Sequence, residues 1–308
     1  MRNLTLRQLR AVEAVSRTGK IVFAAKELGL TQPAVSLQLR DAERAARTPL
    51  FDRTSDGMRP TAAGLAVVSA VQAIEGRLRI LGEEVEAIRG VRRGELKLGV
   101  ASTAKYFAPA IMAAFLREHP DIDMTLTVGN RAEMIDALRS HRIDLALMGR
   151  PPREVSVRSF VFGGHPLVII AATTHPLVHS SNISKERIAD EHFLLREIGS
   201  GTRAALDMFF GDLPERPDAI GVTMGSNETI KQSVIAGLGV ALISAHTIAQ
   251  EVEMGRLAVL DVEGTPIRRQ WFSVTRGDRS TTPIMRAFDE FLQQHANEFL
   301  PKIAAVSA

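Results

Sequence analysis

The chain has 308 residues, of which 45% are hydrophobic and 24% charged, values that exclude a disordered or low-complexity protein. It contains no cysteine, which excludes disulfides, thiolate catalysis and thiolate metal sites. No run of 18 apolar residues occurs and no signal-peptide pattern opens the sequence, so we expect a cytoplasmic protein without a membrane span. Residues 1–60 hold 11 basic and 6 acidic residues, a balance of +5, whereas residues 101–308 hold 21 and 24, a balance of −3. This asymmetry predicts that the basic N-terminal segment, called the head below, binds a polyanion. The alternative is that the head merely has a solvated basic face.

The head has the pattern of a helix-turn-helix. Apolar spacing predicts helices over residues 4–18 and 23–28, and Gly29 separates the second from a third helix that follows the good N-cap Thr31 and runs to residue 47. Glutamine and arginine side chains on the third helix can read base edges. We therefore expect this helix to contact DNA, the alternative being a three-helix domain with a polar face.

Residues 50–60 predict a hairpin, because Asp56-Gly57 separates two short extended segments. Beside a recognition helix, such a wing would bring Arg53 and Arg59 close to the phosphate backbone. The alternative is a plain surface hairpin.

A long helix is predicted over residues 61–89. Its apolar residues recur at alternating spacings of four and three, which is the a/d pattern of a coiled coil. About 29 residues span roughly 43 Å, too far to pack on the head alone. We expect this helix to pair with a second copy, the alternative being that it lies on the body of its own chain. The residues expected at the dimer contact are Val71, Ile74, Leu78, Leu81 and Val85.

From residue 94 onward, strands and helices alternate, which predicts α/β open sheets arranged as two small lobes with a cleft between them. The segment 167–171 is apolar throughout, as expected of a strand in a buried parallel sheet. The other expected strands lie at 96–100, 123–128, 144–148, 192–196, 220–224, 240–243, 257–260 and 270–275, with helices at 107–119, 131–140 and 282–299.

Patterns typical of catalysis are missing from the sequence. It has no H-E-x-x-H, G-x-S-x-G or P-loop pattern. Residues 199–204 fit the loose dinucleotide pattern G-x-G-x-x-A, but no acidic residue ends the next strand. We therefore do not expect an enzyme.

Three strand-to-helix junctions carry hydroxyl or amide side chains, and helix N-termini with free N–H groups bind anions. Lys105 and Arg203 lie within about one turn of two of these junctions. If the junctions face one cleft, they would suit a small phosphorylated or carboxylated metabolite. The alternative is that each side chain only caps its helix. The junction residues are Ser102, Thr103, Ser200, Thr202, Ser226 and Asn227.

The whole chain resembles the LysR-type transcriptional regulators. The segments that carry the resemblance in the head are Leu28–Leu39, Pro49–Arg53 and Thr61–Gly64. The resemblance implies a DNA-binding regulator that forms dimers or tetramers on palindromic sites and can contact RNA polymerase. It implies DNA contacts from Thr31, Gln32, Pro33, Ala34, Ser36, Gln38, Arg40, Arg53 and Arg59.

The same resemblance implies a domain organisation. A winged helix-turn-helix is expected over residues 1–60 and a dimerising linker helix over 61–90. A two-lobed α/β effector domain, similar to periplasmic binding proteins, is expected to follow. Its first lobe would comprise residues 91–164 and 266–308, and its second residues 165–265.

The body is similar to one branch of that family, the CbbR-type regulators of Calvin-cycle (RuBisCO) operons. The matching segments are 102–109, 127–131, 143–152, 196–203, 224–232 and 269–271. The branch implies no resident cofactor but an anionic effector such as ribulose bisphosphate, phosphoglycolate, phosphoenolpyruvate or NADPH. It adds Asn130, Met148 and Gly149 to the expected effector-binding residues. The alternative is a LysR-type regulator of another metabolic operon with a carboxylate effector.

Overall fold

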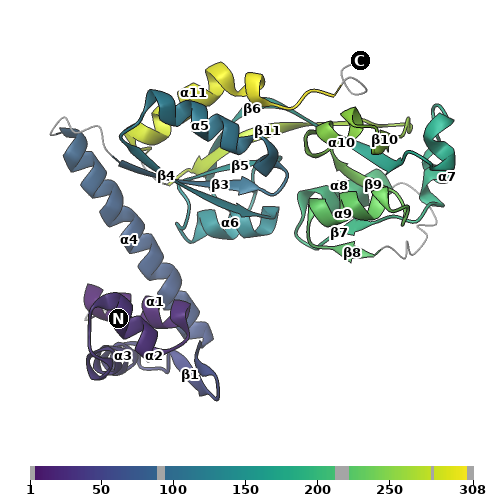
Figure 1. Ribbon diagram of the computed structural model, residues 1–308. Helices are drawn as coiled ribbons and strands as arrows, with labels where there is room; N and C mark the ends of the chain where they lie inside the picture. The colour runs from purple at the N-terminus through teal and green to yellow at the C-terminus, as the bar shows by residue number, and fades with distance from the viewer. Residues whose placement is uncertain (1–3, 89–93, 212–221, 279–280, 304–308) are drawn as a thin grey trace. The chain divides into compact units, whose positions relative to one another are not determined.

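The computed structural model describes residues 4–88, 94–211, 222–278 and 281–303 (Figure 1). Contacts divide the chain into two units, one reaching Val85 and the other comprising most of the remainder. No helix in the described ranges is long and apolar enough to cross a membrane.

The first unit is a winged helix-turn-helix, as predicted. Thr5 and Thr31 cap the first and third helices, and Gly19 and Gly29 end the first two in the left-handed conformation. The two strands pair antiparallel around a tight turn. The elements are α1 (Leu6–Thr18), α2 (Ile21–Leu28), α3 (Gln32–Ala46), β1 (Phe51–Thr54), β2 (Gly57–Pro60) and the long α4 (Ala62–Ile88).

The predicted dimer contact along α4 needs one correction. Val71 is 1% exposed and belongs to the apolar core of the head, together with Val67. The first turns of α4 therefore complete the head, and Val71 is not free to meet a second copy. Farther along, the remaining predicted contact residues are 40–55% exposed in the single chain: Ile74, Leu78, Leu81 and Val85.

The second unit is built on a mixed sheet with the strand order β10-β6-β11-β5-β3-β4, and β9 also pairs with β6. Its strands are β3 (Gly94–Ala101), β4 (Ile122–Gly129), β5 (Leu145–Met148), β6 (Val157–Ala172), β9 (Ala241–Ser244), β10 (Leu257–Val259) and β11 (Ile267–Arg276). A separate parallel pair is formed by β7 (Leu195–Arg196) and β8 (Thr223–Met224). The helices are η1 (Ala104–Tyr106), α5 (Ala108–Glu118), α6 (Arg131–Arg139), η2 (Pro176–His179), α7 (Lys185–Ala189), α8 (Gly201–Phe209), α9 (Asn227–Ile235), η3 (Ala245–Thr247), α10 (Ala249–Glu253) and α11 (Pro283–Phe299).

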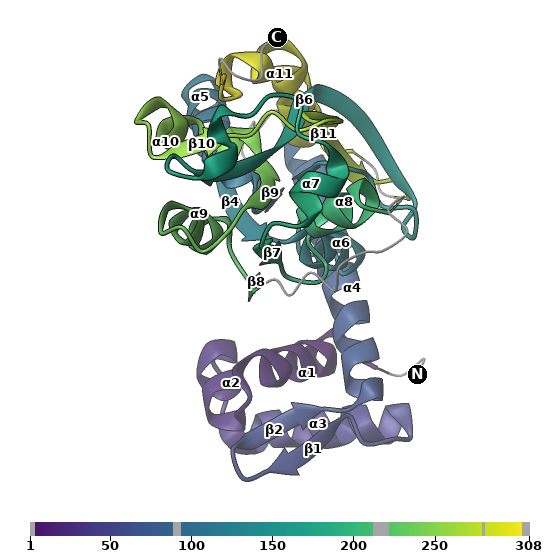
Figure 2. The ribbon, with the colours of Figure 1, turned by 90° about the vertical axis from the view of Figure 1, so that its right-hand side faces the viewer.

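Two long strands join the two lobes of this unit. β6 and β11 pair antiparallel over ten residue pairs, and both run from one lobe into the other (Figure 1). In the described residues, lobe I has one apolar core, made by β3–β5, α5, α6 and α11 with residues of β6 and β11. Lobe II has two cores, one on each face of its strands, and Figure 2 shows α9 and α10 on one side and α7 and α8 on the other.

The predicted parallel setting of segment 167–171 is wrong. β6, which contains it, is antiparallel to β9, β10 and β11. Alternate residues of β6 face different cores, with Leu167 and Ile169 in one and Val168 and Ile170 in the other. An apolar run therefore reports burial on both faces, not strand direction. Most of the expected strand 220–224 lies outside the described residues or in the short β8.

Candidate functional site

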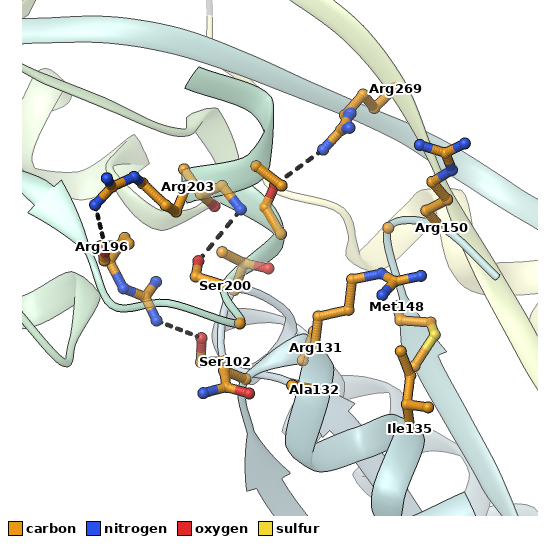
Figure 3. Close-up of a pocket in the computed structure, with 18 of the residues that line it drawn as sticks. Ser102, Arg131, Ala132, Ile135, Met148, Arg150, Arg196, Ser200, Arg203 and Arg269 are labelled. Carbon is orange, nitrogen blue, oxygen red and sulfur yellow. Dashed lines mark hydrogen bonds between the residues drawn. The ribbon is translucent and has the colours of Figure 1, made fainter. Parts of the chain in front are cut away.

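A cavity of about 670 Å³ lies between the two lobes of the second unit (Figure 3). Lobe I contributes the ends of β3 and β5 and the start of α6, and lobe II contributes β7 and the start of α8. The size is typical of a site for a small molecule. Eight of the eleven predicted effector-binding residues line it: Ser102, Thr103, Asn130, Met148, Gly149, Ser200, Thr202 and Arg203.

Three predicted effector-binding residues lie elsewhere. Ser226 caps α9, its Oγ accepting a hydrogen bond from Thr229 N at 3.0 Å. Asn227 is buried behind Arg196, which donates to its Oδ1. Lys105 points to Glu228, with 3.7 Å between Nζ and Oε1. The third junction therefore supports the cavity wall through Arg196 instead of lining the cavity.

Positive charge in the cavity comes from arginines that sequence reasoning did not select. Beside Arg196 and Arg203, the lining includes Arg131, Arg139, Arg150, Arg153 and Arg269. In the described ranges, no carboxylate lies within 4 Å of the guanidinium groups of Arg131, Arg150 and Arg269. Arg269 donates to the Gly201 carbonyl at 3.1 Å and Arg131 to the Pro151 carbonyl at 3.4 Å.

Two of these arginines are held in an unfavourable electrostatic setting. Burial, and then the charges of Arg150 and Arg131, keep the pKa of Arg269 below its ordinary value. Burial also lowers the pKa of Arg131; Glu154 opposes this shift, and Arg150 adds to it. Like charges that crowd a partly desolvated cavity, with Glu154 offsetting them only at Arg131, are expected to attract an anion.

The two cavity arginines on the β7–α8 segment, Arg196 and Arg203, are each paired with a carboxylate. Arg203 Nε lies 3.2 Å from Asp207 Oδ1. Arg196 makes a two-pronged contact to Glu197, at 2.7 and 2.9 Å, and donates to Ser102 Oγ at 3.2 Å. The expectation that Lys105 or Arg203 supplies the charge is wrong for Lys105, which does not line the cavity and points to Glu228. Arg203 does line the cavity, but its charge is shared with Asp207.

Two helix N-termini add backbone donors at the cavity. Ser200 caps α8, its Oγ accepting from Thr202 N at 3.2 Å, and the first residues of α8 line the cavity. Asn130 caps α6, its Oδ1 accepting from Glu133 N at 3.0 Å. Both helices have nine residues, so each presents the positive end of a dipole.

A glycine allows the lobes to approach each other at this point. Gly199 has φ +91°, and a Cβ there would lie 3.0 Å from the Ala132 Cβ. Its carbonyl accepts a hydrogen bond from Ala132 N at 3.2 Å. Any larger residue would be strained and would push the start of α6 away from lobe II.

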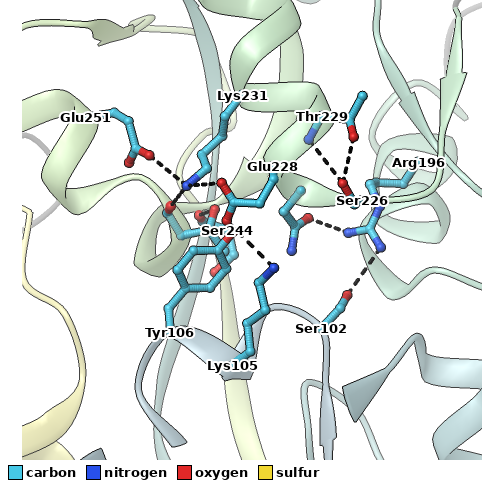
Figure 4. A network of polar contacts seen from close by, with 12 residues as sticks. Ser102, Lys105, Tyr106, Arg196, Ser226, Glu228, Thr229, Lys231, Ser244 and Glu251 are labelled. Atoms are coloured by element: carbon cyan, nitrogen blue, oxygen red, sulfur yellow. Dashed lines mark hydrogen bonds and ion pairs between the residues drawn. The ribbon is translucent and has the colours of Figure 1, made fainter. Parts of the chain in front are cut away.

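A second polar network joins the lobes outside the cavity (Figure 4). Tyr106 of η1 donates its hydroxyl to the Glu228 carboxylate at the start of α9. Lys231 of α9 is buried, with Nζ 3.1 Å from Glu228 and 2.7 Å from Glu251. Burial, and then Glu228, raise the pKa of the Tyr106 hydroxyl, so it is protonated at neutral pH.

The predicted DNA-contacting residues of the first unit lie on or next to the exposed side of α3 and on the wing. Gln32, Ser36 and Arg40 follow one another at four-residue spacing and form one stripe. Gln38 lies on the opposite flank of the helix, so it does not share that stripe. The buried residues of α3, which face the core, are Val35, Leu39 and Ala42.

Both wing arginines are exposed, but they leave opposite faces of the hairpin. Arg53 pairs with Met58 and Arg59 with Asp52, and neighbouring pairs in a hairpin point to opposite sides. One face of the wing can therefore present one of these two arginines to a phosphate backbone.

Family comparisons cover most of the chain. A model described as "LysR substrate binding domain" matches residues 89–297, and one described as "Bacterial regulatory helix-turn-helix protein, lysR family" matches residues 6–65. The HTH-type transcriptional regulator CbbR of Rhizobium meliloti is 57% identical over 304 residues, covering 99% of this chain and 97% of the relative. The RuBisCO operon transcriptional regulator of Allochromatium vinosum is 45% identical over 296 residues, covering 96% and 97%.

Solved structures are similar to the second unit or to both units. The regulatory domain of Synechocystis PCC6803 CcmR, in complex with 2-PG, has a TM-score of 0.61 and 34% identity, covering 66% of this chain and 97% of that domain. Full-length CbnR, complexed with its target DNA, has a TM-score of 0.67 and 21% identity, covering 94% and 99%. At that identity, the likeness to CbnR concerns the fold alone.

Proposed function

The chain belongs to the LysR family of bacterial transcriptional regulators, a family of DNA-binding proteins and not of enzymes, and from this premise we propose that it controls a RuBisCO operon in response to a phosphorylated metabolite. Relatives with 57% and 45% identity carry the names of CbbR and RuBisCO operon regulators, and they align over nearly the whole chain. In this proposal the head binds operator DNA, and the cavity between the lobes binds the effector.

The observation that carries the effector proposal is the group of arginines at the cavity, above all three that have no carboxylate within 4 Å in the part of the chain that the structure describes: Arg131, Arg150 and Arg269. A phosphate group brings a charge of about −1.5 to −2 and three acceptor oxygens. Each charge-assisted hydrogen bond that it accepts contributes about 1.5–3 kcal/mol. A carboxylate has one charge and two oxygens, so it would neutralise the group less completely. The 2-PG complex of the CcmR domain supports the same choice.

Calorimetric titration tests the proposal. We expect 2-phosphoglycolate to bind more tightly than glycolate, which has the same carboxylate but no phosphate. Arg150→Gln is expected to weaken 2-phosphoglycolate binding about tenfold or more. Arg203→Gln is the matched control, because Arg203 lines the same cavity but is already paired with Asp207, and we expect a smaller loss.

Glycolate binding as tightly as 2-phosphoglycolate would favour the alternative, a regulator of another operon with a carboxylate effector. Unchanged affinity in Arg150→Gln would contradict the arginine site itself. Ribulose bisphosphate, phosphoenolpyruvate and NADPH can be compared in the same titration, because each carries a phosphate or carboxylate that suits the site.

The same proposal includes how the protein binds its operator and assembles. The head would read a palindromic operator in the cytoplasm, and the exposed stretch of α4 from Ile74 to Val85 would pair two copies, which can associate further as a tetramer. An effector held by both lobes would shift the equilibrium between subunit arrangements and so alter the DNA complex.

A further inference from the structure

The contact between Tyr106, Lys105 and Glu228 joins the lobes with residues that do not line the effector cavity. Tyr106 and Lys105 stand on η1 of lobe I, and Glu228 stands in the first turn of α9 in lobe II. By contrast, the contacts Ala132–Gly199 and Arg196–Ser102 join the lobes within the cavity wall. A ligand in the cavity can therefore reach the Ala132–Gly199 and Arg196–Ser102 contacts directly. It cannot reach the contact of Tyr106 and Lys105 with Glu228.

Glu228 is held in its ionised form by both lobes. Burial favours the neutral carboxyl, but its effect is outweighed by hydrogen bonds from Tyr106 and Lys231 together with the nearby charges of Lys231 and Lys105. The pKa of Glu228 is therefore lowered. Because Tyr106 keeps its proton, the bond between them is a charge-assisted phenol–carboxylate hydrogen bond.

Lys231 gives this contact a rigid base in lobe II. Its side chain is 4% exposed, and Nζ is fixed by Glu251 at 2.7 Å and by the Thr247 carbonyl at 3.1 Å. The same Nζ lies 4.8 Å from the centre of the Tyr106 ring, and Lys105 Nζ lies 5.2 Å from it. Tyr106 and Lys105 of lobe I thus contact the charged pair Glu228 and Lys231, which is held in place within lobe II.

We infer that Glu228 and Tyr106 form a clasp that holds the lobes in the arrangement in which both line the cavity, and that the strength of this clasp sets the affinity for the effector. The effect on affinity rests on the proposed function. An effector that needs groups from both lobes binds only the molecules in which the lobes are closed, so its apparent affinity is reduced when fewer molecules are closed. Tyr106 and Glu228 are therefore positioning residues.

The first test measures the lobes without any ligand. Because the chain has no cysteine, spin labels can be attached at Glu118→Cys in lobe I and Glu186→Cys in lobe II, both exposed positions. Tyr106→Phe removes only the hydroxyl and keeps the ring under the two lysines. We expect it to broaden the distribution of distances between the labels relative to the parent. Glu228→Gln can still accept a hydrogen bond from Tyr106 but loses its charge. We expect its distance distribution to be broader than that of the parent and narrower than that of Tyr106→Phe.

The matched control is Glu191→Gln. Glu191 also pairs with two basic groups, Arg187 at 2.7 Å and His175 at 3.5 Å, but all three lie in lobe II. We expect this variant to leave the distribution unchanged. An unchanged distribution in Tyr106→Phe, or an equal change in Glu191→Gln, would overturn the clasp.

The second test measures 2-phosphoglycolate binding to the same variants. We expect Tyr106→Phe to weaken binding about three- to tenfold, with faster dissociation, and Glu191→Gln to bind like the parent. Parental affinity in Tyr106→Phe would overturn the link between clasp and affinity. If the parent binds neither 2-phosphoglycolate nor inorganic phosphate, the proposed effector fails and the link to affinity with it, whereas the label distances still decide whether the clasp exists.

Discussion

The single tryptophan of the chain is enclosed by two neutral histidines. Trp271 donates its Nε1 hydrogen to His246 Nδ1 at 3.1 Å, and the His165 ring stacks on it with centroids 3.8 Å apart. Burial lowers the pKa of His246 to about 4 and holds the pKa of His165 well below its ordinary value. Both rings are therefore neutral in the folded protein at physiological pH.

This burial predicts how stability depends on pH. Unfolding restores a histidine pKa of about 6.5. Between pH 6.5 and about 4, His246 is therefore protonated in the unfolded chain but stays neutral in the folded protein. Stability is fully present above pH 6.5 and is lost as the pH falls towards 4, by about 3 kcal/mol for His246 alone. Urea unfolding followed by Trp271 fluorescence should show this loss, and His246→Gln should show a shallower one. Equal slopes for parent and variant between pH 6.5 and 4 would refute the assignment.

At the residue scale, hydroxyl and amide positions were predictable and charge compensation was not. Ser102, Ser200 and Thr202 follow strands, and the ends of neighbouring strands meet in one place. Whether a basic residue is free depends on which carboxylate the fold places beside it. Lys105 lies close to a junction in sequence but turns to Glu228, whereas Arg269 reaches the cavity from β11, far along the chain.

At the scale of elements, α3 has one stripe suited to base contact. Gln32 and Ser36 share that stripe with Arg40, whereas Gln38 lies across the helix. We expect Gln32→Ala to cost roughly 1–3 kcal/mol on the cognate operator and little on random DNA. Gln38→Ala should cost less on the cognate site. Fluorescence anisotropy with both DNAs measures this, and equal losses of Gln32→Ala on the two would show that Gln32 contacts only the backbone.

The exposed stretch of α4 carries the prediction on assembly. Leu78 and Leu81 are 42% and 55% exposed, so replacing them is expected to leave the fold of a single chain intact. Changing both to glutamate would place like charges between two copies of the helix. We expect sedimentation to show loss of the dimer, and binding to a palindromic site to be lost with it. A double variant that stays dimeric would place the dimer contact elsewhere. Val71→Glu, by contrast, should unfold the head.

Elements with local signals were predictable, and those defined by distant partners were not. Caps and glycines mark the ends of α1, α2 and α3 in the sequence. The direction and full length of β6 depend on β9, β10 and β11, which lie about 70 to 120 residues away. Its sixteen residues also include the exposed positions Arg158 and Ser159, which break the apolar pattern before the buried part begins.

Over the whole chain, the proposed function requires that a DNA-binding unit be coupled to a unit that binds an anion. The family comparisons cover both units, from residue 6 to residue 65 and from residue 89 to residue 297. An anion can control DNA binding only if it favours one arrangement of the protein over another. The cavity meets this requirement in principle, because lobe I supplies Arg131 and Arg150 and lobe II supplies Thr202.

The most direct measurement of this account is the bend angle of DNA from the promoter region of the protein's own gene, followed by energy transfer during titration with 2-phosphoglycolate. We expect the angle to change at the ligand concentrations that saturate the cavity in calorimetry. Arg150→Gln should bind the DNA like the parent but need about tenfold more ligand for the same change. A bend angle that does not respond to any phosphorylated ligand that calorimetry shows to be bound, or that responds equally in parent and Arg150→Gln, would contradict it.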